Sequence, residues 1–230
     1  MSGQLNKVCS YEQIESFFFH DMTLMFGGFG GVGSPPTIIK CILDWGIKDI
    51  TIIGNDTGFP HIGIGQLIAA DRVKKVIASH IGSNPIAGRL MSEGELDVEF
   101  SPQGILAERI RAGGVGLKGI VTEIGHDDPY LNKGKKKLEI DGVSYLFESA
   151  LTARVGIIYA KKSDPFGNLV YDKSARNTNP LVAMASDITI VEAEEIVESG
   201  ELDPEEVVTS GVFVDHIVPS KGVDWKWIWE

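Results

Sequence analysis

Residues 21–36, which read DMTLMFGGFGGVGSPP, decide the fold. Thr23–Phe26 is a short apolar run with the length and composition of a buried strand. Gly27–Gly33 predicts a tight turn, because glycine adopts backbone conformations that are closed to other residues. Pro35 and Pro36 suit the start of a helix, where the missing N–H has no helical partner. Apolar residues at helical spacing complete a strand–turn–helix unit: Ile38, Ile39, Ile42 and Leu43.

The same order of strand, turn and helix recurs along the chain. Asp49–Ile53, Val73–Ser79 and Asp97–Phe100 are predicted strands, and Ile64–Ala70 and Ile105–Ala112 are predicted helices. Such alternation is typical of βαβ units, so we predict an α/β fold with a mainly parallel sheet. Further strands are predicted at Arg154–Tyr159, Asp187–Val191 and Val212–Val218, with a helix near Leu181–Ala185.

The middle of the chain has a different pattern. Lys133–Lys137 is a basic run, which we interpret as a solvated loop. Leu138–Ile140 and Val143–Phe147 flank Asp141-Gly142, which is a strong signal for a β-hairpin. No internal repeat or linker is evident, and we therefore predict one domain with an inserted β-hairpin.

The composition narrows the class of protein. A chain of 230 residues is long enough for one α/β domain with a sizeable core. Its net charge of −11 argues against wrapping nucleic acid or an anionic membrane, because both attract clustered Lys and Arg. Cys9 and Cys41 lie outside any metal-binding spacing, so we predict no metal site. The first residues lack the apolar stretch of a signal peptide, and we predict a cytoplasmic protein.

The glycine-rich turn is compatible with more than one ligand. Gly28, Gly30 and Gly33 match the G-x-G-x-x-G pattern of a Rossmann loop, with Asp56 at the distance of a ribose ligand. An NAD-dependent oxidoreductase is therefore one hypothesis. The two prolines at the helix start argue against it, because a pyrophosphate would need N–H donors there. A non-catalytic binding domain that uses the same loop is a further alternative.

Several blocks together resemble family I CoA-transferase α subunits. Asp21–Pro35 is similar to the family signature G-G-F-x-x-x-G-x-P after an apolar strand, although Met22 stands where the family usually has Gly or Asn. Within the family, the chain is most similar to the α subunits of acetate/acetoacetate (butyrate–acetoacetate) and 3-oxoacid CoA-transferases. The other blocks follow in family order across residues 10–218: Gly54–Thr57, Gly63–Gly65, Ala78–Gly82, Asn84-Pro85, Ser101–Gly104, Ala107–Gly114 and Ala175–Pro180.

The resemblance implies a fold, an activity and a partner. The family fold is an open sheet with helices on both faces. Family members move CoA between two carboxylic acids by ping-pong chemistry, through a glutamyl-CoA thioester. The glutamate lies in a Ser-Glu-Asn-Gly motif of the β subunit, so the expected assembly is a heterodimer or an α2β2 heterotetramer. Acyl-CoA would be a substrate, with no tightly bound cofactor. Ser92-Glu93-Gly94 lacks the Asn of that motif, and we interpret Glu93 as a loop residue.

The resemblance also suggests candidate site residues. Gln103 corresponds to the family glutamine that helps form an oxyanion hole, although its sequence context alone favours a turn residue that caps the next helix. The family's CoA-binding loop corresponds to Gly27, Gly28, Phe29, Gly30, Gly31, Val32 and Gly33. Asn55, Ser79, His80 and Asn84 follow predicted strands, on the side where α/β sheets bind ligands, and are substrate-pocket candidates. His80 is either a proton carrier or a residue bonded to loop backbone.

The end of the chain departs from the family pattern. We predict a CoA-transferase α-subunit domain over residues 1–218 and a tail over 219–230. The tail contains Trp225, Trp227 and Trp229 at alternating positions, which is typical of an edge strand that docks on another subunit.

Overall fold

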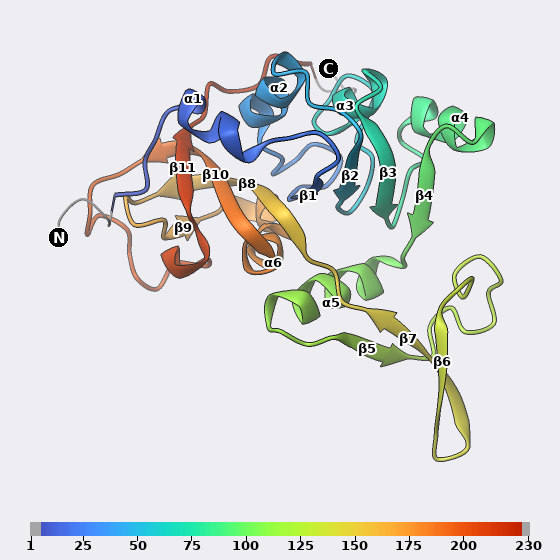
Figure 1. The fold of residues 1–230 in the computed structure, drawn as a ribbon. Helices are drawn as coiled ribbons and strands as arrows, with labels where there is room; N and C mark the ends of the chain where they lie inside the picture. The colour runs from blue at the N-terminus through green and yellow to red at the C-terminus, as the bar shows by residue number, and fades with distance from the viewer. Residues whose placement is uncertain (1–5, 227–230) are drawn as a thin grey trace.

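A computed structural model describes residues 6–226, and an eight-stranded sheet lies at its centre (Figure 1). The strands are β1 (Thr23–Phe26), β2 (Ile50–Ile53), β3 (Val73–Ala78), β4 (Asp97–Phe100), β8 (Ala153–Ser163), β9 (Leu169–Val170), β10 (Ser186–Ile196) and β11 (His216–Pro219). Their order is β11-β10-β8-β1-β2-β3-β4, with β9 beside β8. All neighbours in this order are parallel, and only the β8–β9 pair is antiparallel. The predicted mainly parallel sheet is confirmed.

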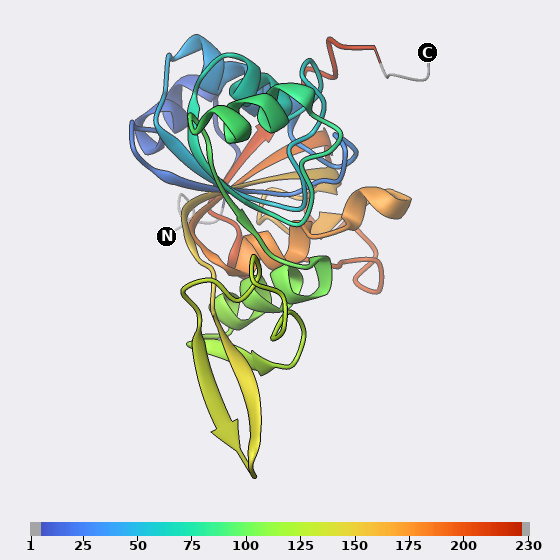
Figure 2. The ribbon, with the colours of Figure 1, turned by 90° about the vertical axis from the view of Figure 1, so that its right-hand side faces the viewer.

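Helices cover both faces of this sheet, as expected from the family resemblance (Figures 1 and 2). One face carries α1 (Tyr11–Ile14), α2 (Pro36–Asp44), α3 (Gly65–Ala69) and α4 (Pro85–Glu93). The other face carries α5 (Gln103–Gly114) and α6 (Asn179–Met184). Three short 3₁₀ helices complete the helical elements of residues 6–226: η1 (Glu15–Phe17), η2 (Lys173–Arg176) and η3 (Gly211–Phe213). None of the helices in this range has the length and apolarity that a bilayer crossing demands.

Two hydrophobic cores, one on each face, hold the layers together. Side chains alternate across a strand, so Leu24 and Phe26 of β1 pack into the core that contains α2, whereas Met25 packs into the core that contains α5. All three are at most 1% exposed. Burying a side chain of this size contributes about 1.5–3 kcal/mol. Burial on both faces is the reason why β1 is apolar at successive positions.

The order in which the chain adds strands to the sheet reverses at β1. From β1 the chain builds β2, β3 and β4 outward on one side, and later returns to build β8, β10 and β11 outward on the other. In open α/β sheets, ligands bind beyond the carboxyl ends of the strands at such a reversal. The glycine-rich turn follows β1 and therefore lies at the expected ligand position.

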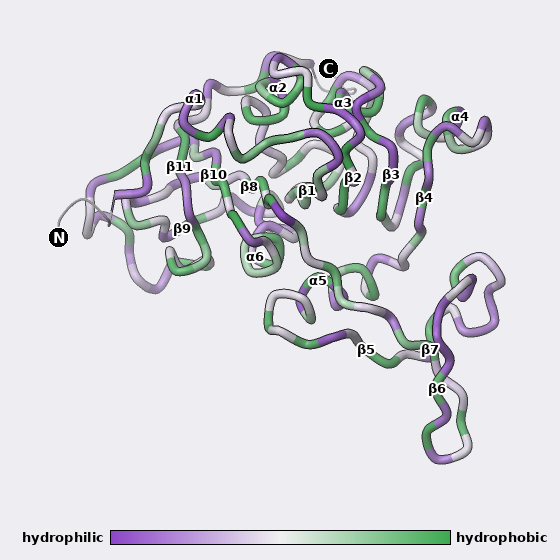
Figure 3. Tube along the Cα trace, viewed as in Figure 1, coloured by the Kyte–Doolittle hydropathy of each residue, from purple (hydrophilic) through white to green (hydrophobic). Residues whose placement is uncertain are grey.

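A small antiparallel sheet projects from the main body after α5 (Figure 2). It contains β5 (Gly119–Thr122), β6 (Lys136–Ile140) and β7 (Val143–Ser149), in the order β5-β7-β6. The β6–β7 pair is the predicted hairpin, and the pattern did not predict β5. Hydrophobic and hydrophilic residues are mixed along these strands (Figure 3). Lys135 is not solvated as predicted, because it forms an ion pair with the buried Glu148.

Other local predictions also differ from the structure. The strand predicted at Val212–Val218 is confined to β11, because Gly211 packs against the backbone of Phe166 and residues 211–213 form η3. Glu93 is the last residue of α4 and not a loop residue; its carboxylate pairs with Arg89 on the same helix. Trp225 lies in a bend and not in a strand, while Trp227 and Trp229 are outside the described residues.

Candidate active site

The glycine-rich loop between β1 and α2 has a compact, closed shape. Phe29 and Val32 exchange two backbone hydrogen bonds of 3.0 Å across its tip. Gly33 has a φ of +77°, and a Cβ there would lie 2.3 Å from the carbonyl oxygen of Ala175. A side chain at this position would therefore meet both backbone strain and a clash, which accounts for the glycine.

Two asparagines that precede and begin α6 hold this loop from the other half of the sheet. Asn177 Oδ1 accepts from the N–H of Gly28 at 2.9 Å, and its Nδ2 donates to the carbonyl of Val32 at 3.1 Å. Asn179, which is fully buried, donates to the carbonyl of Gly33 at 3.0 Å. These residues were not among the candidates, although they lie in the Asn-Thr-Asn-Pro block that matched the family.

A second loop of the same design follows the neighbouring strand, β2. Gly58-Phe59-x-x-Ile62-Gly63 repeats the pattern Gly28-Phe29-x-x-Val32-Gly33, and Phe59 and Ile62 form the equivalent backbone bridge. A Cβ at Gly63 would lie 3.3 Å from the Cα of Gly31, so the two loops pack closely. The two turns thus share a six-residue motif, which is shorter than the structural repeats that the prediction of no internal repeat concerned.

A cavity of about 310 Å³ opens beside the first loop. It brings together four of the predicted site residues: Gly28, Phe29, Asn55 and Gln103. Gln103 is the first residue of α5 and not part of a turn, and its Nε2 donates to Asn55 Oδ1 at 2.8 Å. Phe29 remains 53% exposed at the mouth. Ala107 and Asn177 are among the other lining residues, and all the residues that line the cavity are uncharged.

The remaining pocket candidates do not line this cavity. Ser79 contacts the lining residue Asn55, because its Oγ donates to the backbone carbonyl of Asn55 at 2.7 Å. His80 is exposed at the end of β3. Asn84 is 1% exposed and caps α4: its Oδ1 accepts from the N–H groups of Ile86 and Ala87.

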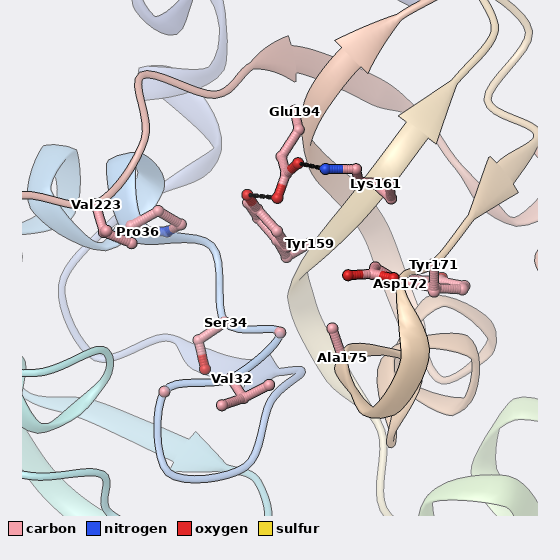
Figure 4. Close-up of a pocket in the computed structure, with 12 residues that line it drawn as sticks. Val32, Ser34, Pro36, Tyr159, Lys161, Tyr171, Asp172, Ala175, Glu194 and Val223 are labelled. Carbon is pink, nitrogen blue, oxygen red and sulfur yellow. Dashed lines mark hydrogen bonds and ion pairs between the residues drawn. The ribbon is translucent and has the colours of Figure 1, made fainter. Parts of the chain in front are cut away.

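A second cavity, of about 200 Å³, lies against residues 31–34 of the same loop (Figure 4). Tyr159 donates to Glu194 at 2.7 Å, and Lys161 forms an ion pair with the same carboxylate. Burial and the neighbouring Glu194 raise the pKa of Tyr159. Burial also raises the pKa of Glu194, but the bonds from Lys161 and Tyr159 outweigh it and hold that pKa below its ordinary value. These polar groups therefore satisfy one another.

Two contacts disagree with the dinucleotide-binding alternative. The N–H groups of Thr37 and Ile38, at the start of α2, donate to the buried carboxylate of Glu192 at 2.8 and 3.0 Å. The position that a pyrophosphate would take at this helix is thus filled by a side chain of the protein. Burial raises the pKa of Glu192, against the hydrogen bonds that lower it. Asp56, the expected ribose ligand, is 3% exposed and accepts instead from the N–H of Gly30.

Comparison with known proteins identifies close relatives. The sequence model of one protein family, described as Coenzyme A transferase, matches residues 11–220. The chain is 60% identical to a probable coenzyme A transferase α chain of Bacillus subtilis (strain 168), over 90% of each chain. It is 48% identical to the acetate CoA-transferase α chain of Escherichia coli (strain K12), over 94% of this chain and 97% of the relative. It is 45% identical to the corresponding chain of a succinyl-CoA:3-ketoacid coenzyme A transferase of Helicobacter pylori (strain J99), over 85% and 84%.

A solved structure has the same fold. The acyl-CoA transferase from Escherichia coli O157:H7, determined as a thioester complex with CoA, aligns with a TM-score of 0.84 at 23% identity. The alignment covers 94% of this chain and 48% of that one. The fold agrees with the family match over residues 11–220 and with the identity to curated relatives. This chain therefore belongs to the coenzyme A transferase family.

Proposed function

We propose that this chain is the α subunit of an acetate/acetoacetate (butyrate–acetoacetate) type CoA-transferase, working with a β subunit that carries the nucleophilic glutamate. The observation that carries this is the cavity where the Gln103 amide meets the glycine-rich loop. Its lining is uncharged, so an attacking carboxylate would enter from outside the cavity. Glu93 is not a competing nucleophile, because it lies on the surface of α4 in an ion pair. Relatives named as α subunits support the division between two chains.

The chemistry assigns different roles to the two chains. A partner glutamate oxygen attacks the thioester carbonyl, the carbon–sulfur bond breaks, and the CoA thiolate leaves. The thiolate then attacks the glutamyl carbonyl, which forms glutamyl-CoA and releases the first acid; the second acid reverses these steps. Negative charge develops on the carbonyl oxygen in each addition. Gln103 uses one of its two Nε2 hydrogens on Asn55, and the other is the proposed donor to that oxyanion.

The cavity also supports a choice among acyl groups. A succinyl group carries a second carboxylate, which is costly to bury without a cationic partner. The residues that line the cavity offer amide and apolar groups, as a neutral acyl chain of two to four carbons requires. We therefore favour acetate, butyrate and acetoacetate over succinate as substrates. The cytoplasmic location and the choice between a heterodimer and α2β2 stay predictions.

The proposal predicts that activity needs both chains. The purified chain is mixed with a candidate β subunit that contains Ser-Glu-Asn-Gly, and acetyl-CoA formation from acetoacetyl-CoA and acetate is measured. We expect activity in the mixture and none from this chain alone. A β subunit with that glutamate changed to Gln is the matched control.

Two results would contradict the proposal. Full transferase activity from this chain alone would remove the division between subunits. A kcat/KM for succinyl-CoA with acetoacetate above that for acetoacetyl-CoA with acetate would overturn the assigned acyl groups while leaving the α-subunit role in place.

A further inference from the structure

We propose that Asp56 is a positioning residue that sets the direction of the Gln103 amide by acting through Asn55. The three side chains form a continuous chain of hydrogen bonds, in which Gln103 and Asn55 line the 310 Å³ cavity and Asp56 lies behind Asn55. Gln103 Nε2 donates to Asn55 Oδ1 at 2.8 Å, and Asn55 Nδ2 donates to Asp56 Oδ2 at 3.0 Å. This inference rests on the proposed function, in which Gln103 is the oxyanion donor.

Asp56 accepts hydrogen bonds at both of its oxygens. Its Oδ1 accepts from the N–H of Gly58 at 2.6 Å, and its Oδ2 accepts from the N–H of Gly30 at 2.9 Å as well as from Asn55. All three partners are donors, and the residue is 3% exposed. A carboxylate satisfies all three donors and has no proton of its own to give.

The Asp56 carboxylate fixes which end of each amide donates and which end accepts along this chain of hydrogen bonds. The oxygen and the nitrogen of a side-chain amide are similar in size, so an amide can turn end for end with little steric cost. Asn55 must direct its NH₂ group at Asp56, which leaves its oxygen facing Gln103. Gln103 must then direct its own NH₂ group at Asn55. The second hydrogen on that nitrogen is thereby fixed, and an oxyanion would meet a donor and not a carbonyl oxygen.

The same carboxylate also holds the glycine-rich loop through Gly30, so two roles have to be separated by experiment. A residue that only holds the loop would affect binding of acyl-CoA. A residue that orients Gln103 would affect the stability of the oxyanion, and therefore kcat, and would lose its effect once Gln103 is removed.

The test is a double-mutant cycle in the enzyme assembled with its β subunit. Asp56→Asn replaces one of the two acceptor oxygens with an NH₂ group, so the N–H groups of Gly30 and Gly58 and the amide of Asn55 are no longer all satisfied, and Asn55 is no longer held in one orientation. We expect kcat to fall toward the roughly 10²-fold loss of Gln103→Ala, with little change in the KM for acetoacetyl-CoA. Adding Asp56→Asn to Gln103→Ala should lower kcat little further, because both changes remove one donor.

Asp164→Asn is the matched control. Asp164 is also buried and accepts from the N–H groups of Phe166 and Asn168 at 3.0 and 2.9 Å, but it organises the turn between β8 and β9. We expect this variant to lose thermal stability and keep its kcat. Asn55→Ala is the second variant of this chain of hydrogen bonds, because it breaks the link to Gln103 and keeps both Asp56 bonds to backbone. Asn55→Ala should also lower kcat, and its effect should be smaller when it is introduced into the Gln103→Ala variant.

The outcomes separate this inference from the proposed function. Additive effects of Asp56→Asn and Gln103→Ala, or a raised KM with unchanged kcat, would show that Asp56 only holds the loop. If Asp56→Asn did not fold, an additive effect of Asn55→Ala would overturn the inference equally. An unchanged kcat in Gln103→Ala would remove the proposed oxyanion donor, and the role of Asp56 would fall with it.

Discussion

His216 shows how one half-buried side chain makes stability depend on pH. It begins β11, and its ring packs against Phe17 with a centroid separation of 4.6 Å. Burial lowers the pKa of His216 below its ordinary value, against the opposing charge of Asp215. The folded protein therefore favours the neutral ring. The unfolded chain takes up the proton first as pH falls through about 6.5, and stability is lost from there toward the folded pKa.

This argument predicts the behaviour of His216→Phe, which keeps an aromatic ring and cannot titrate. Between pH 7.5 and 5.5, the free energy of unfolding of the native sequence should fall relative to that of the variant. Urea unfolding at a series of pH values measures the difference. Parallel curves for the two proteins would mean that His216 has the same proton affinity in the folded and unfolded states.

At the scale of elements, the strands were easier to predict than α4. Strands β1 and β2 are largely apolar runs, and β3 ends in one at Val76–Ala78, because both faces of the sheet are buried there. The signals for α4 were present: Asn84 at the N-cap, proline at the first position and Gly94 after the end in left-handed conformation. Only Ala87 of this helix is fully buried, so the hydrophobic periodicity that marks a helix was weak.

The cap of α4 gives a prediction for Asn84→Ala. Loss of the side chain removes its bonds to the first turn of α4 and to the carbonyl of Thr57, and should cost about 1–2 kcal/mol of stability. The KM for acyl-CoA should not change, because Asn84 does not line the cavity. Gly88→Ala on the same helix is the control: its Cβ would meet open space, and it should stabilise by about 0.5–1 kcal/mol. A raised KM in Asn84→Ala at unchanged stability would show that Asn84 contributes to binding of acyl-CoA and not to the cap of α4.

At the scale of the whole molecule, a buried ionic cluster joins the small sheet to the main body. Arg109 of α5 is 6% exposed and donates to Glu99 of β4 at 2.9 Å and to the carbonyl of Ser149 at 2.8 Å. Glu148 of β7 is 2% exposed, 3.8 Å from Arg109 and 2.6 Å from Lys135. These charges connect β4, α5 and β7, three elements that lie in different parts of the fold (Figure 1).

Removing one member of this cluster should be costly. Glu148→Ala leaves Arg109 and Lys135 without their shared carboxylate, and we expect a loss of about 3 kcal/mol in the free energy of unfolding. The double variant Arg109→Leu/Glu148→Leu should lose less, because it removes both buried charges together and replaces them with apolar side chains. Chemical denaturation compares the two. A larger loss in the double variant would show that the cluster is a net source of stability.

The sequence by itself determined the strand–turn–helix order, the parallel sheet, the hairpin and the glycine-rich loop, because periodicity and turn chemistry are local properties of the chain. Its blocks also pointed to the family. Only the tertiary structure decided which groups meet: Asn177 holds a loop formed some 150 residues earlier, and Gln103 meets Asn55 across 48 residues. It also placed Glu192 at the start of α2 and turned Asp56 inward. Each of these polar groups has many possible partners in the chain, and the packing of the sheet and its helices selects one.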